Sequence, residues 1–107
     1  MINNRFEKSE INKVSSGLIM AITAVQFGMK GMVERQKEYE QQGKELLDYL
    51  ANPEGPINKK YPNFLEEHGD TLEKARENFP GEDSLNYLQE LLETSIKMGV
   101  RERRRFQ

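Results

Sequence analysis

The hydrophobic positions in the first half of the chain recur with the period of a long α-helix. From residue 11 to residue 50, every seventh position is apolar, and half of the positions four residues later are apolar as well. No proline precedes residue 53, so no residue forces a break in this segment. We therefore predict one long helix over residues 1–50, with a kink or break near Gly28 and Gly31 as the alternative.

The second half of the chain predicts two shorter helices after a connector. Residues 51–60 contain two prolines and a glycine, which end the first helix. Residues 61–80 have apolar side chains at helical spacing, with Gly69 as a candidate interruption. Residues 83–100 predict a third helix, followed by a basic tail over residues 101–107. The apolar stripe of the third helix consists of Leu85, Leu88, Leu92 and Ile96, widened by Leu91.

The predicted fold class is all-α, because no run of alternating β-branched residues indicates a strand. The predicted arrangement is a long N-terminal helix packed antiparallel against the two shorter ones, as a helical hairpin or three-helix bundle. We expect a single domain over residues 1–107, because this length is near the lower end for a self-sufficient core.

The middle of the predicted long helix is apolar on more than one side. Residues 17–29 carry no charged side chain. One face bears the small residues Gly17, Ala21, Ala24 and Gly28, which let another helix approach closely. The opposite flank bears the bulkier side chains of Ile19, Met20, Phe27 and Val33. A helix that is apolar on several sides must be covered on several sides.

This surplus of apolar surface leaves two interpretations open. In one, the segment is the central helix of a monomeric bundle. In the other, which we favour, a second chain covers part of it, as a homodimer or a complex with a protein partner. The predicted partner-binding residues are Leu18, Ile22, Val25, Met29 and Met32. On this interpretation, Val25→Asp dissociates the dimer and leaves the fold intact.

Positive charge gathers at the C-terminus of an otherwise acidic chain. Residues 97–105 carry five cations and one carboxylate, a net charge of +4, within a chain whose net charge is -2. Such a cluster can contact phosphates, dock on an acidic protein surface or complement the negative end of the last helix. A solvated helix end is the plain alternative. The candidate contact residues are Arg101, Arg103, Arg104 and Arg105.

The chain offers little that indicates catalysis. The absence of cysteine excludes disulfides, thiol catalysis and thiolate metal sites, and it is compatible with a reducing compartment. The only histidine, His68, has neither the Glu-x-x-His spacing of a carboxylate-bridged metal site nor a nucleophile motif around it. We predict no enzyme activity and no cofactor. The uncharged segment is too short to span a bilayer, so we expect a cytoplasmic protein with no membrane contact.

These patterns predict a non-enzymatic helical interaction protein, an adaptor, chaperone or inhibitor, that binds a protein partner or itself through an apolar helix face. The alternative is a small nucleic-acid-associated protein or ribonucleoprotein subunit that uses the C-terminal arginine cluster. The predicted hairpin outline resembles the small partner proteins of type VII secretion substrates. The connector lacks the Trp-x-Gly signature of those hairpins, so no residue role is transferred.

Overall fold

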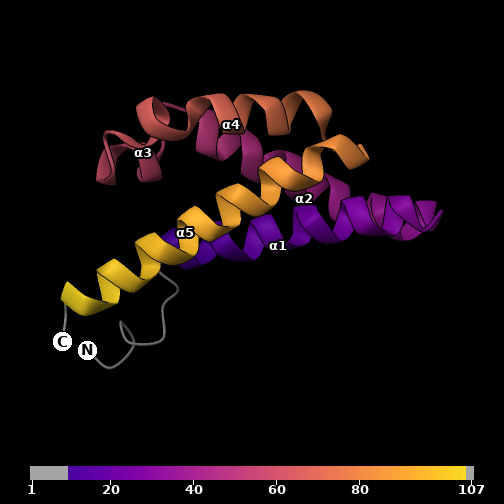
Figure 1. Cartoon of the computed structure of the whole chain (residues 1–107), viewed down its shortest axis with the longest axis horizontal. Helices are drawn as coiled ribbons and strands as arrows, with labels where there is room; N and C mark the ends of the chain where they lie inside the picture. The colour runs from indigo at the N-terminus through magenta and orange to yellow at the C-terminus, as the bar shows by residue number, and fades with distance from the viewer. Residues whose placement is uncertain (1–9, 106–107) are drawn as a thin grey trace.

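The computed structural model describes residues 10–105, with side chains as far as Arg101. Its four main helices are α1 (Glu10–Met29), α2 (Val33–Ala51), α4 (Phe64–Asn78) and α5 (Leu85–Arg105), joined by the short helix α3 (Pro56–Lys60) and the 3₁₀ turn η2 (Glu82–Ser84). No strand occurs over this range, and the predicted all-α class is confirmed. α1 and α4 each pack against both α2 and α5 (Figure 1). None of the helices in this range has the length and apolar content needed to cross a membrane.

The predicted single helix over residues 1–50 is wrong, because the chain reverses at residues 30–32. The backbone N–H of Met32 donates to Phe27 O at 2.9 Å, and that of Gly31 donates to Gly28 O at 3.0 Å. This pair of bonds is the Schellman arrangement that ends a helix. Gly31 has a φ of 76°, which a glycine adopts without the steric cost that a side chain brings. The break that the sequence left as an alternative is therefore the one that forms.

The two helices on either side of the break form an antiparallel hairpin. A Cβ added at Gly43 would lie 3.1 Å from Ala21 Cβ, and one added at Gly17 would lie 2.7 Å from a Leu46 side-chain carbon. The small residues of α1 therefore do admit a close neighbour, and that neighbour is α2 of the same chain.

The remaining boundaries also differ from the predicted ones. The connector over residues 51–60 contains α3, and the buried Asn58 ties it to the end of α2 by donating from Nδ2 to Leu50 O and Asn52 O at 2.9 and 2.8 Å. α4 runs through Gly69 without interruption. α5 continues past Gly99 to Arg105, so residues 101–105 of the predicted tail are helical.

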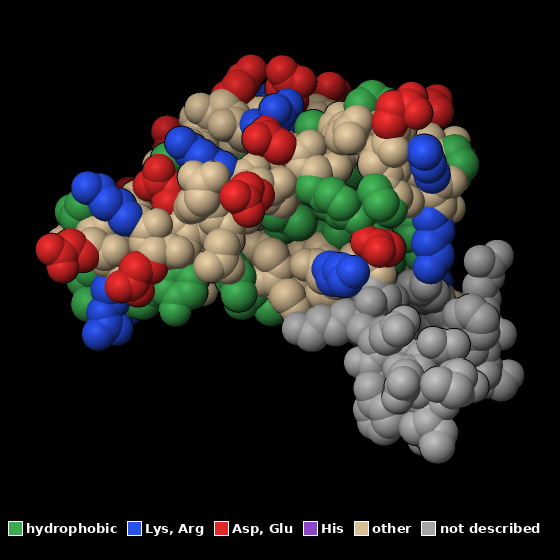
Figure 2. All heavy atoms as spheres, turned by 180° about the vertical axis from the view of Figure 1, so that it is seen from behind, with side chains coloured by type: hydrophobic (Ala, Val, Ile, Leu, Met, Phe, Trp, Pro, Cys, Tyr) green, Lys and Arg blue, Asp and Glu red, His purple; other side chains and the backbone are tan. Residues whose placement is uncertain are grey.

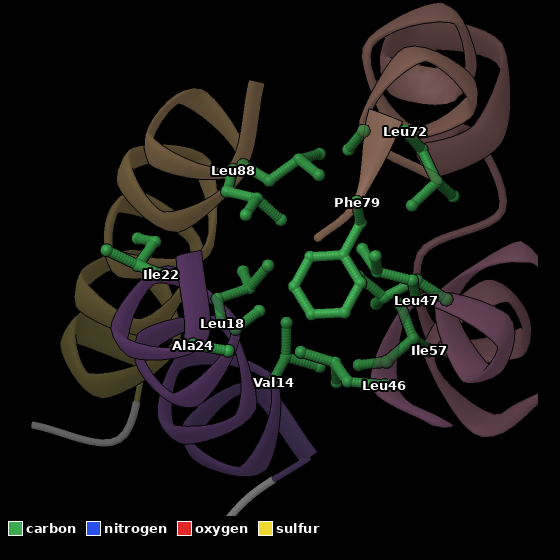
Figure 3. Close-up of a cluster of buried hydrophobic side chains, with 14 of the residues drawn as sticks. Val14, Leu18, Ile22, Ala24, Leu46, Leu47, Ile57, Leu72, Phe79 and Leu88 are labelled. Atoms are coloured by element: carbon green, nitrogen blue, oxygen red, sulfur yellow. The ribbon is translucent and has the colours of Figure 1, made fainter. Parts of the chain in front are cut away.

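The core is centred on Phe79, which lies between α4 and η2. Its ring is surrounded by aliphatic side chains from all four main helices, as Figure 3 shows. The labelled neighbours include Val14 and Leu18 from α1, Leu46 and Leu47 from α2, Leu72 from α4 and Leu88 from α5. Phe79 precedes a cis peptide bond to Pro80. One continuous hydrophobic cluster thus joins the two halves of the chain.

A hydrogen bond between Tyr49 and Glu10 links α2 to the start of α1. The Tyr49 hydroxyl donates to Glu10 Oε2 at 2.5 Å, and Glu10 also lies 3.7 Å from Lys13 Nζ. The pKa of Tyr49 is raised from 10.0 to about 12, first by burial and then by the hydrogen bond to Glu10 and the negative charge of Glu10. The neutral phenol is therefore the form that the fold stabilises.

We expect a corresponding loss of stability in strong base. Because the folded pKa lies above the unfolded value, the stabilisation is complete below pH 10 and is lost as the pH rises toward 12. The difference in tyrosinate absorbance between the wild type and Tyr49→Phe measures this pKa. Glu10→Gln should lower the pKa but leave it above 10, because burial is the largest cause of the shift. An ordinary tyrosine titration at Tyr49 would contradict the assignment.

Candidate functional site

The structure separates the five predicted partner-binding residues into two groups. Leu18, Ile22 and Val25 are at most 9% exposed and belong to the core. Met29 and Met32, at the end of α1 and in the turn to α2, are 51% and 39% exposed. The first three lie on the side of α1 that the rest of the chain covers. Leu18, Ile22 and Val25 are therefore not available on the surface of the folded chain, and the predicted partner-binding site is corrected at these three positions. Partner binding by Met29 and Met32 stays a prediction.

A different apolar strip lies on the outer side of the α1–α5 pair. Ser15 and Ser95 share a hydrogen bond of 2.7 Å, which joins the two antiparallel helices at one level. Ile19 lies one turn beyond Ser15, about 6 Å along α1. Leu92, on the turn of α5 that precedes Ser95, is displaced by about 4.5 Å in the same direction, so it comes nearly level with Ile19. We call the residues Ile19, Leu92 and Ile96 the outer strip.

The outer strip is the part of the surface that sequence reasoning misplaced. Ile19 and Ile96 are 53% and 50% exposed, and Leu92 is half-buried. The apolar stripe predicted for the third helix contains Leu92 and Ile96 together with Leu88 and Leu91, but only Leu88 and Leu91 of these four are fully buried in α5. The bulky flank of α1 did include Ile19, and this was the signal that could have identified the strip.

The surface of α1 around the outer strip carries no charge. From residue 14 to residue 29 no side chain is charged, although ten of these sixteen positions are exposed or half-buried. Since 32% of the chain is charged, about five charged residues would be expected in such a segment. Elsewhere on the molecule acidic and basic side chains are mixed, and hydrophobic side chains line the lower edge, where α1 lies, in Figure 2. Depletion of charge is a property of interface centres.

The predicted arginine site is described only in part. Arg101 lies on α5 and is exposed. Arg103, Arg104 and Arg105 belong to the same helix, but their side chains lie outside the described residues. Contact of the four arginines with phosphate or with an acidic partner therefore stays a prediction.

A cleft of about 610 Å³ lies between the α3–α4 corner and the C-terminal half of α5. Three cationic side chains line it: Lys60 from α3, and Lys97 and Arg101 from α5. The other lining residues are Tyr61, Pro62, Asn63, Phe64, Glu67, His68, Thr94 and Met98. We call this cavity the basic cleft. Its volume is within the range of about 300–1,000 Å³ that small-molecule sites occupy.

The charged side chains that line the basic cleft differ in the contacts that they make. His68 Nε2 lies 3.7 Å from Glu67 Oε2, and the His68 ring packs against Phe64 with their centroids 5.4 Å apart. Within the described part of the chain, no carboxylate forms an ion pair with Lys97 or Arg101. Lys60 Nζ lies 5.8 Å from the centroid of the Tyr61 ring.

The sequence could not predict this cleft, because its lining comes from two segments separated by 25 residues that carry no recognisable motif.

No cluster of three or more histidine, aspartate or glutamate residues with the geometry of a metal site occurs among residues 10–101. Comparison of the chain with protein-family models, curated proteins and solved structures finds no match. The outer strip and the basic cleft are therefore the two candidate sites, and both rest on the geometry of this chain.

Proposed function

We propose that this chain is a non-enzymatic helical interaction protein that binds another protein through the outer strip. The observation that carries the proposal is the exposure of Ile19 and Ile96 on a helix pair whose α1 side is uncharged over residues 14–29. Fully burying an isoleucine stabilises an assembly by about 1.5–3 kcal/mol relative to leaving it exposed. A cytoplasmic location and a role as adaptor, chaperone or inhibitor belong to the same proposal.

The partner that fits this surface most simply is a second copy of the chain. In a twofold dimer the same patch meets itself, so any charge near the axis faces a like charge. A patch built from Ile19, Leu92, Ile96 and uncharged side chains such as Gln26 meets no such repulsion. Met29, at the end of the same helix, extends the apolar surface.

The test is an equilibrium sedimentation series on the wild type and Ile19→Asp. The substitution removes apolar contact and places a carboxylate in the interface of both protomers. Because Ile19 is already about half buried in the single chain, the lost burial alone amounts to about 1.5–3 kcal/mol per dimer, and the desolvation and mutual repulsion of the two carboxylates add to it. We expect the dimer to weaken at least 100-fold while the far-UV circular dichroism stays unchanged, because Ile19 is 53% exposed in the single chain.

Gln42→Asp is the matched control. It places the same charge at an exposed position of α2, away from the outer strip, and it should leave self-association unchanged. A wild type that is monomeric at tens of micromolar would contradict a second copy as the partner. Equal weakening by both variants would show that added negative charge, rather than the outer strip, controls association.

The alternative function, contact with nucleic acid, is supported by the position of Arg101 beside Lys97 on one side of the basic cleft. The net charge of -2 gives the molecule no overall attraction to a polyanion, so any such contact would concentrate at this end. Oligonucleotide binding that falls steeply with salt, and that disappears when Arg101, Arg103, Arg104 and Arg105 are replaced by alanine, is the measurement that would establish it.

A further inference from the structure

We propose that the turn between α1 and α2 binds the surface of a bilayer that contains anionic lipids, with Met32 and Val33 entering the apolar boundary and the neighbouring cations contacting the headgroups. We call residues 29–33 the hairpin tip. The proposal departs from the expectation of no membrane contact, which rested on the length needed to cross a bilayer. A tip that enters one leaflet needs no crossing helix.

The hairpin tip concentrates exposed apolar side chains. Among residues 10–101, five large hydrophobic side chains are exposed, and two of them belong to the outer strip. The other three lie within five consecutive residues of the hairpin tip: Met29, Met32 and Val33. Val33 is 52% exposed, as much as Ile19. Apolar side chains gathered in this way on a surface mark a contact with a protein or a membrane.

The hairpin tip also projects from the body of the molecule. At the right of Figure 1, the α1–α2 hairpin extends beyond the adjacent ends of α4 and α5. A Cβ added at Gly31 would meet no atom within 4 Å, so the backbone of the turn is open to its surroundings. A projecting apolar turn can enter the boundary between headgroups and acyl chains, where interfacial apolar groups are buried to a depth of about 5–10 Å.

The small size of the hairpin tip favours a bilayer over a protein partner. A stable protein interface involves about 20–30 residues on each side. The hairpin tip has five residues, and the polar surface of α2 begins directly after it. A bilayer sets no such requirement of area, because each apolar side chain that enters it gains burial on its own.

The charges nearest to the hairpin tip are mostly positive. Lys30 lies in it, and Arg35 and Lys37 lie on the first turns of α2, so that with the carboxylate of Glu34 residues 29–37 carry a net charge of +2. Within the described part of the chain, none of these three cations forms an ion pair with a carboxylate. Anionic headgroups attract lysine and arginine side chains that lie near the bilayer surface.

Further negative charge lies away from the hairpin tip. Glu38 is about 7.5 Å from Val33 along the axis of α2, and Glu40 is about 10.5 Å from it. Glu40 is also paired with Lys44 at 3.7 Å. On α1, no side chain from residue 14 to residue 29 is charged. A bilayer that meets the hairpin tip end-on therefore contacts apolar and basic side chains before it approaches most of the acidic ones.

The first experiment places a fluorescent probe on the hairpin tip. Val33→Trp introduces a single tryptophan, because the chain contains none. With vesicles of equal parts phosphatidylserine and phosphatidylcholine at low salt, we expect its emission to shift to the blue and to be quenched by brominated acyl chains. Ile96→Trp is the matched control, since Ile96 is 50% exposed but lies on the outer strip, and we expect no quenching there.

The second experiment is cosedimentation of the full-length wild type with the same vesicles. Three half-exposed apolar side chains and a net charge of +2 should bind more weakly than one myristoyl chain, whose binding constant is about 10⁴ M⁻¹. We expect half of the protein to be bound at a lipid concentration on the order of 1–10 mM. Binding to vesicles of phosphatidylcholine alone should be at least about tenfold weaker, because the electrostatic attraction is absent.

Substitutions separate the apolar and the charged contributions. Val33→Ser should weaken vesicle binding about three- to tenfold, because a half-exposed side chain gains about half of its full burial. Val33→Leu keeps an apolar side chain at the same position and should bind at least as tightly as the wild type. Lys30→Gln should weaken binding about fivefold. Lys59→Gln removes an exposed lysine on α3, at the opposite end of Figure 1, and should change binding little.

Three outcomes would overturn the proposal. The first is the absence of binding at a lipid concentration about tenfold above the expected midpoint. The second is a tryptophan at position 33 that the brominated chains do not quench. The third is vesicle binding that Val33→Ser and Lys30→Gln leave unchanged but that disappears when alanine replaces the predicted arginine site, which would assign the contact to the C-terminus. These results do not depend on the oligomeric state, which tests the outer strip.

Discussion

Val25→Asp should unfold the chain rather than dissociate an assembly. Val25 is 1% exposed and lies in the core on the side of α1 that the rest of the chain covers. A carboxylate there loses its hydration without gaining a partner, and the chain must leave it charged in an apolar environment or protonate it. We expect a loss of at least about 4 kcal/mol, which approaches the whole free energy of unfolding of a domain at the lower end of the usual range of about 5–15 kcal/mol. This reverses the expectation drawn from the sequence alone.

Urea denaturation followed by circular dichroism at 25 °C measures this effect. Val25→Thr, close in shape but with a hydroxyl, should cost about 1–3 kcal/mol and leave the chain folded. Ile19→Asp introduces the same carboxylate six positions earlier on α1, and we expect its unfolding midpoint in a monomeric background to stay near that of the wild type, because Ile19 is half exposed. If the Val25→Asp variant is folded and monomeric, Val25 lies at an interface between chains, and its assignment to the core is contradicted.

Phe79→Ala should cost about 3–5 kcal/mol, the usual range for emptying an aromatic site in a core. The ring is 8% exposed and lies at the centre of the cluster contributed by all four main helices. It also fills the space above Gly43, where an added Cβ would lie 2.6 Å from Phe79 Cζ. Gly43→Ala should therefore destabilise the wild type by about 1–3 kcal/mol through overpacking.

The two substitutions should not be additive. In the Phe79→Ala background the closest contact of the new methyl group is gone, and what remains is the contact with Ala21 at 3.1 Å. We expect a coupling free energy of about 1–2 kcal/mol in a double-mutant cycle measured by urea denaturation. Gly69→Ala is the matched control, since a Cβ at Gly69 meets no atom within 4 Å. It should stabilise α4 by about 0.5–1 kcal/mol in either background. Additive costs at Gly43 and Phe79 would contradict the packing described here.

The sequence by itself determined the fold class and several residues of the hydrophobic core. Helical spacing of apolar residues, with no alternating strand pattern, predicted an all-α chain, and that period is a local property of the backbone. Spacing also located a seam on α1 whose members Leu18 and Val25 are indeed buried. The small residues Gly17 and Ala21 correctly indicated a close helix neighbour, because the absence of a large side chain has the same meaning in any fold.

The tertiary structure alone decided what covers the seam and where the helix ends. Gly31 is compatible with a continued helix at a cost of about 1 kcal/mol or with a left-handed C-terminal position, and the packing of α2 back on α1 selects the second. Once the hairpin forms and α5 packs beside it, Leu18 and Val25 become core, and exposure shifts to Ile19 and Ile96. The basic cleft also depends on the tertiary structure, since the path of α3 and α4 places Lys60 on the cavity that Lys97 and Arg101 line from α5. Periodicity shows which side chains need covering, but which part of the chain covers them is a long-range choice that no local pattern encodes.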